Sequence, residues 1–423
     1  MKQERSPGQY KLESVSLYSS IRDDYLEIVD IVGELNIYED MFKNAISGNM
    51  IIEDEWSIMS KFPLVGHEDV IILLDTPSSD DEMKLVFQIY KLSDYARKSD
   101  QASVYTLNLI SKEYMLNQGL TISKSYPQSI ISDIVKRVYD ELYLHNSYIK
   151  PKEIEIENTR SIQDIWIPNW KPFDAINWLA SKSVSEGKFG SNFFFYENRD
   201  GYHFKSVEEL ASVNEPAEIY RHAPKNYPHP EKEMLPKEDQ HKTVEEYNIE
   251  FTYDVLSNLR MGMYSSRVIY HDMISRLYAI NDYNYTEEWN NHKHIGNSMM
   301  LSPTEERNKF QEKKLSYQKI IPISNEAQGL DNNVQDRLSQ LQQLQSFRMN
   351  ITIIGDVSRR IGDIIEMEIE SPEVKVDGKY KSDPFYSGRY LITGLRHIIN
   401  TIGHTTLIEM VKDSYFDVGL LEE

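Results

Sequence analysis

The chain has 423 residues, no cysteine and a formal net charge of −21. This length suggests roughly two to four domains, the lack of cysteine excludes disulfides and thiolate metal sites, and the excess acid argues against a grip on nucleic-acid phosphates. Because the first ten residues are polar and no run approaches ~18 apolar residues, we expect neither a signal peptide nor a membrane span, and a mature chain that starts at Met1.

Residues 1–120 are predicted to form a first β-barrel domain. Runs of β-branched and aromatic residues favour strands, with Gly33 at a bulge or bend after the second one. Ser111 and the acidic residue that follows predict a short, serine-capped helix at the end of the domain. The expected strands are 15–19, 25–32, 50–53, 69–75, 85–90 and 104–110.

Residues 121–216 are predicted to form an α+β module. From residue 125 to 142 apolar residues recur with the 3.6-residue period of a helix, and Pro127 suits its first turn. A second helix is expected at 173–184. The run 193–206 predicts a β-hairpin that turns at Asp200 and Gly201.

The next part of the chain alternates ordered and polar stretches. Four prolines between 224 and 242 predict a linker, and 247–253, 254–260 and 266–271 favour strand, helix and strand. Residues 281–317 are polar and irregular. A helix is expected at 333–346, where a narrow apolar stripe among glutamines is typical of a surface helix or of one lying on a neighbouring subunit.

The clearest strand pattern lies at 347–416. Ile365, Met367 and Ile369 alternate with three glutamates, which indicates a strand with one dry and one wet face. Further strands are expected at 349–354, 390–399 and 405–411, the last two joined by a turn at 400–403. Four strands without a helix predict a small antiparallel barrel or sandwich.

The predicted fold class is therefore α+β and β-rich. Two similar antiparallel β-barrel modules flank an inserted helix-plus-hairpin module, and their similar patterns suggest a duplicated barrel. The second barrel is expected to be discontinuous, from 217–275 and 345–423, with a polar excursion at 276–344 that ends in a helix.

Common catalytic motifs are absent from the sequence. It contains no GxxxxGK[ST], GxSxG or GxGxxG, and His67-Glu68 is followed by Ile71 where a zinc-protease motif needs histidine. Acidic pairs such as Glu287-Glu288 are expected in so acidic a chain and do not define a glycosidase site. We therefore predict no catalytic residue, no cofactor and no metal site.

Histidines and tryptophans supply the remaining candidates. His292 and His294, joined by His222, His229 and His241, could bind a metal, but no acidic partner is spaced to orient them, which favours solvated loop histidines. Trp166, Trp170 and Trp178 could stack on sugar rings. Loop aromatics that pin a helix onto a domain or subunit interface are favoured instead.

Several runs, in the same order along nearly the whole chain, resemble baseplate hub subunits of contractile-tailed (myovirus-type) bacteriophages. They are 105–113, 125–142, 169–180, 196–206, 262–272, and 387–393 leading to 411–414. The resemblance implies a structural protein and not an enzyme. Such subunits form a homotrimeric ring at the end of the tail tube, with two tube barrels per subunit.

The resemblance also implies partners and a location. The ring would adapt the sixfold tail tube or its initiator proteins to a threefold central spike, contact baseplate wedge proteins, and let DNA pass without specific binding. The protein would be part of the virion, after assembly in the host cytoplasm. The expected interface or lumen residues are Glu366, Glu368, Glu370, Trp166 and Trp170.

Two alternatives remain at this point. The tryptophans and the many acids are compatible with a tail-associated cell-wall or glycan hydrolase. The hub of a phage-related contractile injection system would share the fold and mechanism, and its spike would have to be a separate polypeptide.

Overall fold

The computed structural model describes most of the chain, in segments separated by short gaps. The described residues are 10–19, 23–62, 64–76, 83–99, 102–144, 150–160, 162–187, 190–222, 242–251, 254–272, 276, 278–299, 317–323, 333–371 and 382–415. The linker predicted at 224–242 falls almost wholly outside them. Within these segments no helix combines the length and apolarity needed to cross a bilayer.

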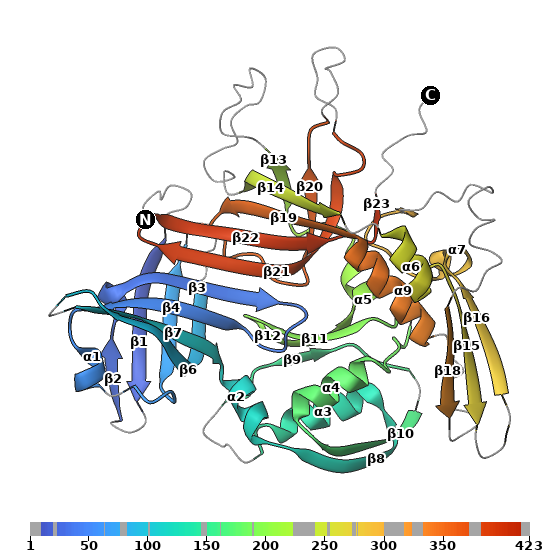
Figure 1. Ribbon diagram of the computed structural model, residues 1–423, viewed down its shortest axis with the longest axis horizontal. Coiled ribbons are helices and arrows are strands. Elements are labelled where there is room, and N and C mark those ends of the chain that lie inside the picture. The colour runs from blue at the N-terminus through green and yellow to red at the C-terminus, as the bar shows by residue number, and fades with distance from the viewer. Residues whose placement is uncertain are drawn as a thin grey trace.

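A curved antiparallel sheet forms the first β module (Figure 1, left). Its strands are hydrogen-bonded in the order β2-β1-β5-β6-β7-β4-β3. Alternate residues point into one hydrophobic core, as Val70, Ile72 and Leu74 do from β5. The elements are β1 (Lys11–Ser19), β2 (Asp24–Glu27), η1 (Val29–Ile31), β3 (Val32–Asp40), β4 (Ser47–Asp54), α1 (Ile58–Lys61), β5 (Asp69–Asp75), β6 (Met83–Arg97) and β7 (Ser103–Ser111).

The strand predicted at 25–32 is wrong in part, because the chain divides there into β2, a 3-10 turn and the start of β3. The sequence prediction missed most of β3. Gly33 does lie at a bulge, between Val32 and Glu34, as expected.

Six strands close the second barrel. Their order is β21-β20-β13-β14-β19-β22, and β22 pairs back onto β21. The pairs are antiparallel except that β13 runs parallel to both of its neighbours, β14 and β20. The strands are β13 (Ile219–His222), β14 (Thr243–Phe251), β19 (Phe347–Ile354), β20 (Ile364–Glu368), β21 (Gly388–Asn400) and β22 (Gly403–Val411).

The alternation predicted for 365–370 is confirmed. Ile365, Met367 and Ile369 are buried in the barrel core, whereas the glutamates between them are half-buried on the outer side.

The two β modules share one strand plan. In the first, β3-β4-β7-β6-β5-β1 are neighbours in that order, and in the second β14-β19-β22-β21-β20-β13 are. Strands β1, β3, β4, β5, β6 and β7 of the first module therefore correspond, in this order, to β13, β14, β19, β20, β21 and β22 of the second. The duplication suggested by the sequence pattern is therefore present in the topology.

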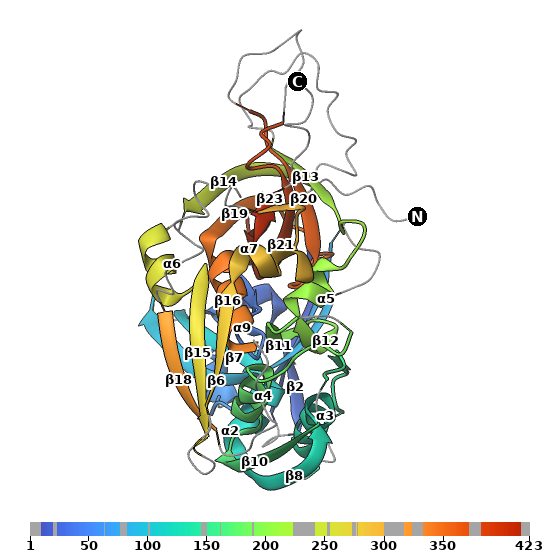
Figure 2. The same ribbon diagram turned by 90° about the vertical axis from the view of Figure 1, so that its right-hand side faces the viewer.

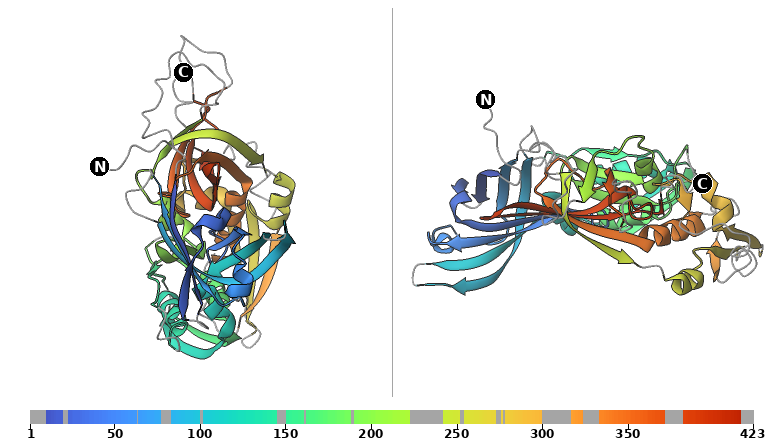
Figure 3. Two further views of the ribbon diagram at one scale, coloured as in Figure 1. Left: turned by 90° about the vertical axis from the view of Figure 1, so that its left-hand side faces the viewer. Right: turned by 90° about the horizontal axis from the view of Figure 1, so that it is seen from above.

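A direct strand pairing joins the two modules. β3 pairs antiparallel with the second half of β21, from Asp40 opposite Gly394 to Glu34 opposite Asn400. The two modules thereby become one 13-stranded sheet, and they lie side by side along the long axis (Figure 3, right). We call this pairing the internal joint.

The α+β module lies beneath the joint in Figure 1 and has its own aromatic core. Its hairpin turns at Asp200 and Gly201, as predicted. Its elements are α2 (Lys112–Gly119), β8 (Ile122–Ile130), α3 (Ile131–Glu141), β9 (Ile154–Ile156), β10 (Ile162–Trp170), α4 (Pro172–Ala180), β11 (Phe193–Asn198), β12 (Gly201–Ser206) and α5 (Val207–Ala211).

Two local predictions in this module are wrong in part. Residues 125–130 form a strand that pairs with β10, so the helix begins at Ile131 and Pro127 lies in β8. The short helix expected after Ser111 is present as α2 with Ser111 at its N-cap, but the serine hydroxyl makes no cap hydrogen bond, because it donates to the buried Glu197 carboxylate. In both cases a partner distant in sequence overrides the local signal.

A further small sheet, β16-β15-β18, stands at the end of the long axis away from the first β module (Figure 1, right) and faces the viewer in Figure 2. The prediction that 281–317 is irregular is therefore wrong for residues 281–291, 298–299 and 317 and confirmed for 292–297, and 300–316 lie outside the described residues. The elements are α6 (Val255–Met261), β15 (Ser265–Asp272), β16 (Tyr278–Asn284), α7 (Tyr285–Glu288), η3 (Trp289–Asn291), β17 (Ser298–Met299), β18 (Tyr317–Ile323), α9 (Asn333–Ser346) and β23 (Ser414–Tyr415).

Candidate functional site

Helix α9 buries its polar side. Gln335, Ser339 and Gln343 follow one another at four-residue spacing and are all buried, whereas Val334 on the predicted apolar stripe is exposed. Gln335 donates to the backbone carbonyls of Ser266 and Asn281, and Ser339 donates to that of Met263. The prediction of a surface helix is wrong, because these amides and hydroxyls satisfy backbone groups of the neighbouring sheet.

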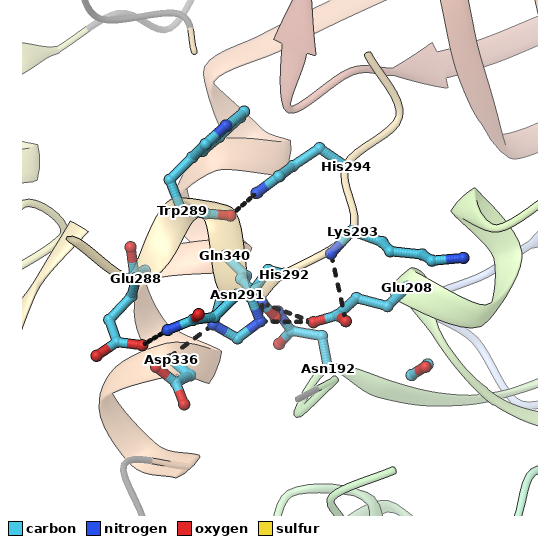
Figure 4. A network of polar contacts seen from close by, with 12 residues as sticks. Asn192, Glu208, Glu288, Trp289, Asn291, His292, Lys293, His294, Asp336 and Gln340 are labelled. Carbon is cyan, nitrogen blue, oxygen red and sulfur yellow. Dashed lines mark hydrogen bonds and ion pairs between the residues drawn. The ribbon is translucent and has the colours of Figure 1, made fainter. Parts of the chain in front are cut away.

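His292 lies at the centre of a buried charged network (Figure 4). Its Nδ1 is 2.7 Å from Glu208 Oε1 on α5, and its Nε2 is 3.8 Å from Asp336 Oδ1 on α9. Gln340 donates to Glu208 and accepts from Asn192. The network therefore connects segment 281–299 to α5, to α9 and to the start of β11.

The charge of this network is set by its burial and its partners. Burial alone would lower the pKa of His292, but Asp336 and Glu208 outweigh burial and raise that pKa to about 9. Burial raises the pKa of Asp336 despite its histidine neighbour. At neutral pH His292 is thus an imidazolium held between two acidic side chains, and removing it would leave their charge uncompensated.

His294 likewise contacts a buried carboxylate that is distant in sequence. Its Nδ1 is 2.7 Å from Asp413 Oδ2, its Nε2 is 3.2 Å from the carbonyl oxygen of Trp289, and its ring stacks on the Trp289 indole at 3.3 Å. Both ring nitrogens thus face oxygen atoms of the protein. Although burial opposes it, His294 lowers the pKa of Asp413 below its ordinary value.

The preference for solvated histidines is wrong for both residues. Their acidic partners exist but lie 84 and 119 residues away in sequence, so spacing could not reveal them. His222 is half-buried and meets Tyr247 edge to face at 4.7 Å, far from this network in the fold, and His229 and His241 lie outside the described residues. The segments that are described contain no group of three or more side chains placed to hold a metal ion.

The predicted interface glutamates lie on the outer face of the second barrel. Glu368 pairs with Arg221 of the neighbouring strand β13 at 2.6 Å, and Glu366 lies opposite Arg389 in the β20–β21 register. Glu370 follows the end of β20 and bridges to Ser382. The three acids thus share one face, as expected, and basic residues border two of them.

The tryptophans do not form one cluster. Trp170 on β10 meets Trp178 on α4 edge to face at 5.2 Å, and Lys182 lies over the Trp178 ring. Trp166 lies on the same strand but is 66% exposed. Trp166 and Trp170 thus belong to a strand and not to a loop. The edge-to-face pair offers packing rather than a flat platform for a sugar.

Comparisons with known proteins agree on one class. No protein-family model matches the chain. A probable baseplate hub protein of Vibrio phage KVP40 is 19% identical over 417 residues, which cover 92% of this chain and 91% of that protein. The sequence is thus similar to a baseplate hub protein over nearly its whole length, and the predicted resemblance is confirmed.

Two solved structures of tail proteins share the fold. A tail protein from Neisseria meningitidis MC58 matches with a TM-score of 0.57 and 13% identity, covering 96% of this chain and 97% of that one. The 43 kDa tail protein of prophage MuSo2 from Shewanella oneidensis matches with a TM-score of 0.52 and 11% identity, covering 95% and 98%. The chain therefore shares its β-rich fold with these two tail proteins.

Proposed function

We propose that this chain is the central hub subunit of a contractile tail's baseplate, and that three copies form a ring. The observation that carries the proposal is the shared strand plan of the two β modules, since three copies would place six similar modules in one ring. A sixfold tail tube would then meet a nearly sixfold surface on a threefold body. The sequence likeness to a hub protein supports the same function.

The proposal includes the partners named by the resemblance. The ring would join the tail tube or its initiator proteins to a central spike, with wedge proteins around it, in a virion assembled in the host cytoplasm. With −21 on each chain, the channel would repel DNA and let it pass. The proposed domains are a first barrel at 1–120, an α+β module at 121–216 and a second barrel at 217–275 and 345–423. The polar excursion at 276–344 lies between the two parts of the second barrel.

Native mass spectrometry, with and without the spike protein, tests the ring together with a reconstruction of the particle. We expect three copies per hub at the end of the tube. A monomer at every concentration, with no threefold density in particles, would refute the proposal. The hub of a phage-related injection system would give the same mass, and its position in a particle would distinguish it.

The hydrolase alternative gains no support from the site. The described tryptophans form no stacking platform, and the acids around His292 are buried. The similar proteins are named as tail or baseplate proteins, which fits a structural role.

A further inference from the structure

The two strands paired in the internal joint, β21 and β3, each have a counterpart in the other β module. These counterparts are β6 and β14. In the joint, β21 pairs with β20 up to Leu391 and with β3 from Gly394 onward. Its counterpart β6 pairs with β5 only up to Gln88, and no described strand pairs with that edge beyond it. β14, the counterpart of β3, pairs with β13 only at Thr243 and Val244 in the described part of the chain.

The correspondence extends to single residues. Residues 32–37 read VGELNI and residues 244–249 read VEEYNI, and each run has a bulge between its valine and its glutamate. Asn36 lies opposite Asn49, and Asn248 lies opposite Asn350. The shared register therefore aligns β3 with β14 without any gap.

The other side of the joint aligns equally well. Ile89 of β6 and Ile392 of β21 each precede a bulge, opposite Leu109 and Met410 of the strand that follows in the barrel. Beyond the bulge, Ser93 corresponds to Arg396. At the end of the strand, Lys98 corresponds to Asn400.

We propose that β6 of one copy pairs antiparallel with β14 of the next copy, so that the contact between copies repeats the internal joint. This inference rests on the proposed function for the existence of a ring. The register of the internal joint, transferred to these edges, sets Lys98 opposite Glu246, Ala96 opposite Asn248, and Ser93 opposite Glu250. Each copy offers one edge of each kind, the head-to-tail contact from which rings are built.

Charge identifies a second copy of this chain as the occupant. Residues 89–98 on the β6 edge carry three basic residues and one acid, whereas residues 243–251 of β14 carry three glutamates and no base, so the two edges are oppositely charged within a chain of net charge −21. Lys98 is 2.8 Å from Glu53, but both side chains are more than half exposed. Such an exposed ion pair contributes little to stability, so Lys98 can exchange Glu53 for another partner.

The β6 edge also carries features that limit indiscriminate pairing. Its register with β7 shifts between Ser93 and Ala96, and Asp94 within that bulge has a φ of 55°. A bulge and a lysine on an open edge hinder strand addition by unrelated chains. The bulge interrupts the proposed pairing at one point and leaves matched residues on both sides of it.

The absence of cysteine permits a direct test by disulfide trapping. Facing residues of an antiparallel pair have Cα atoms roughly 4.5–5.5 Å apart, within the range a disulfide spans. The chain with Lys98→Cys and Glu246→Cys, oxidised in purified form and in assembled particles, should give covalent dimers and larger species. Asn400→Cys with Glu34→Cys, the equivalent pair of the internal joint, should close within one chain and give only monomers.

A register control uses Lys98→Cys with Glu250→Cys, which lies four residues away along β14 and should not cross-link. If particles contain three copies but the matched pair yields no covalent dimer, the proposed contact is wrong and the proposed function stands. Cross-links to a different protein alone would equally overturn the contact. A single copy per particle would refute both.

Discussion

Glu39 is a buried carboxyl group at the internal joint, opposite Leu395 on β21. Burial raises its pKa to about 8, although Arg199 and Arg360 act in the opposite direction. The unfolded chain releases this proton near pH 4.5. The native state therefore binds the proton more tightly, and the associated stability is complete below about pH 4.5 and lost as the pH rises through about 8.

Glu39→Gln should consequently stabilise the protein at high pH. The amide imitates the protonated carboxyl. We therefore expect the free energy of unfolding at pH 9 to rise by an amount on the order of a few kcal/mol, and the melting temperature to rise with it. At pH 4.5 the variant and the natural chain should unfold alike. Glu34→Gln, on the same strand but half-buried, is the control. A lower melting temperature for Glu39→Gln at pH 9 would contradict the prediction.

His292→Ala should destabilise the fold by removing the cation between Glu208 and Asp336. Leaving buried carboxylates unpaired costs about 3–5 kcal/mol, measurable by urea unfolding at pH 6. Because the folded pKa of His292 is raised to about 9, its contribution is complete below about pH 6.5 and lost as the pH rises through 9. The variant should lack that pH dependence. His271→Ala, an exposed histidine, should unfold like the natural chain, and equal losses in both would refute the role assigned to the network.

At the scale of elements, β20 carries core-packing residues on one face and charged residues on the other. Met367 is fully buried in the barrel, so Met367→Asp places a carboxylate in the core and should cost several kcal/mol in unfolding free energy. The triple replacement of Glu366, Glu368 and Glu370 by Lys should keep its thermal transition, since the exposed Arg221–Glu368 pair contributes at most about 1 kcal/mol.

We further expect the triple variant to assemble poorly, or to yield particles that eject DNA slowly, because the sign of that face is reversed. Thermal denaturation measures the fold, and particle yield measures assembly. Unfolding of the triple variant together with tolerance of Met367→Asp would show that the outward face has a packing role that the burial pattern does not indicate.

The strands with one dry face could be predicted from the sequence, and those with competing signals could not. The period of two identified β5, β7, β19 and β22 because one face of each is buried in a single barrel core. Residues 125–130 of β8 were predicted as helix, since the pairing of β8 with β10 is non-local. The orientation of α9 was reversed because two of its buried polar side chains, Gln335 and Ser339, donate to backbone carbonyls, which an apolar stripe cannot reveal.

At the scale of the whole molecule, the sequence pattern suggested two similar barrels but not how they join. β3 has mixed polarity, with Glu34 and Asn36 in its centre, because one of its edges serves the internal joint. The site was inaccessible to sequence reasoning for the same reason, since Glu208 and His292 meet only once the α+β module and the excursion are both in place. Pairings between distant segments decide both features.

Salt dependence follows from the charge of the whole molecule. Copies of net charge −21 repel one another, whereas the Lys98–Glu246 contact would add about 0.2–1 kcal/mol. The repulsion involves many charges and is screened over ~10 Å at 0.1 M salt. It should therefore dominate, and association of copies, measured by analytical ultracentrifugation, should strengthen from about 20 to 200 mM salt.

Lys98→Glu should weaken association and make that salt dependence steeper, because it adds like charge at the contact itself. Lys150→Glu changes the net charge equally at an exposed position before β9 and is the matched control. Since Lys150 lies on neither β6 nor β14, its replacement should alter association only slightly. Equal weakening by the two substitutions would show that the copies respond to total charge alone, and would place their contact away from the β6 edge.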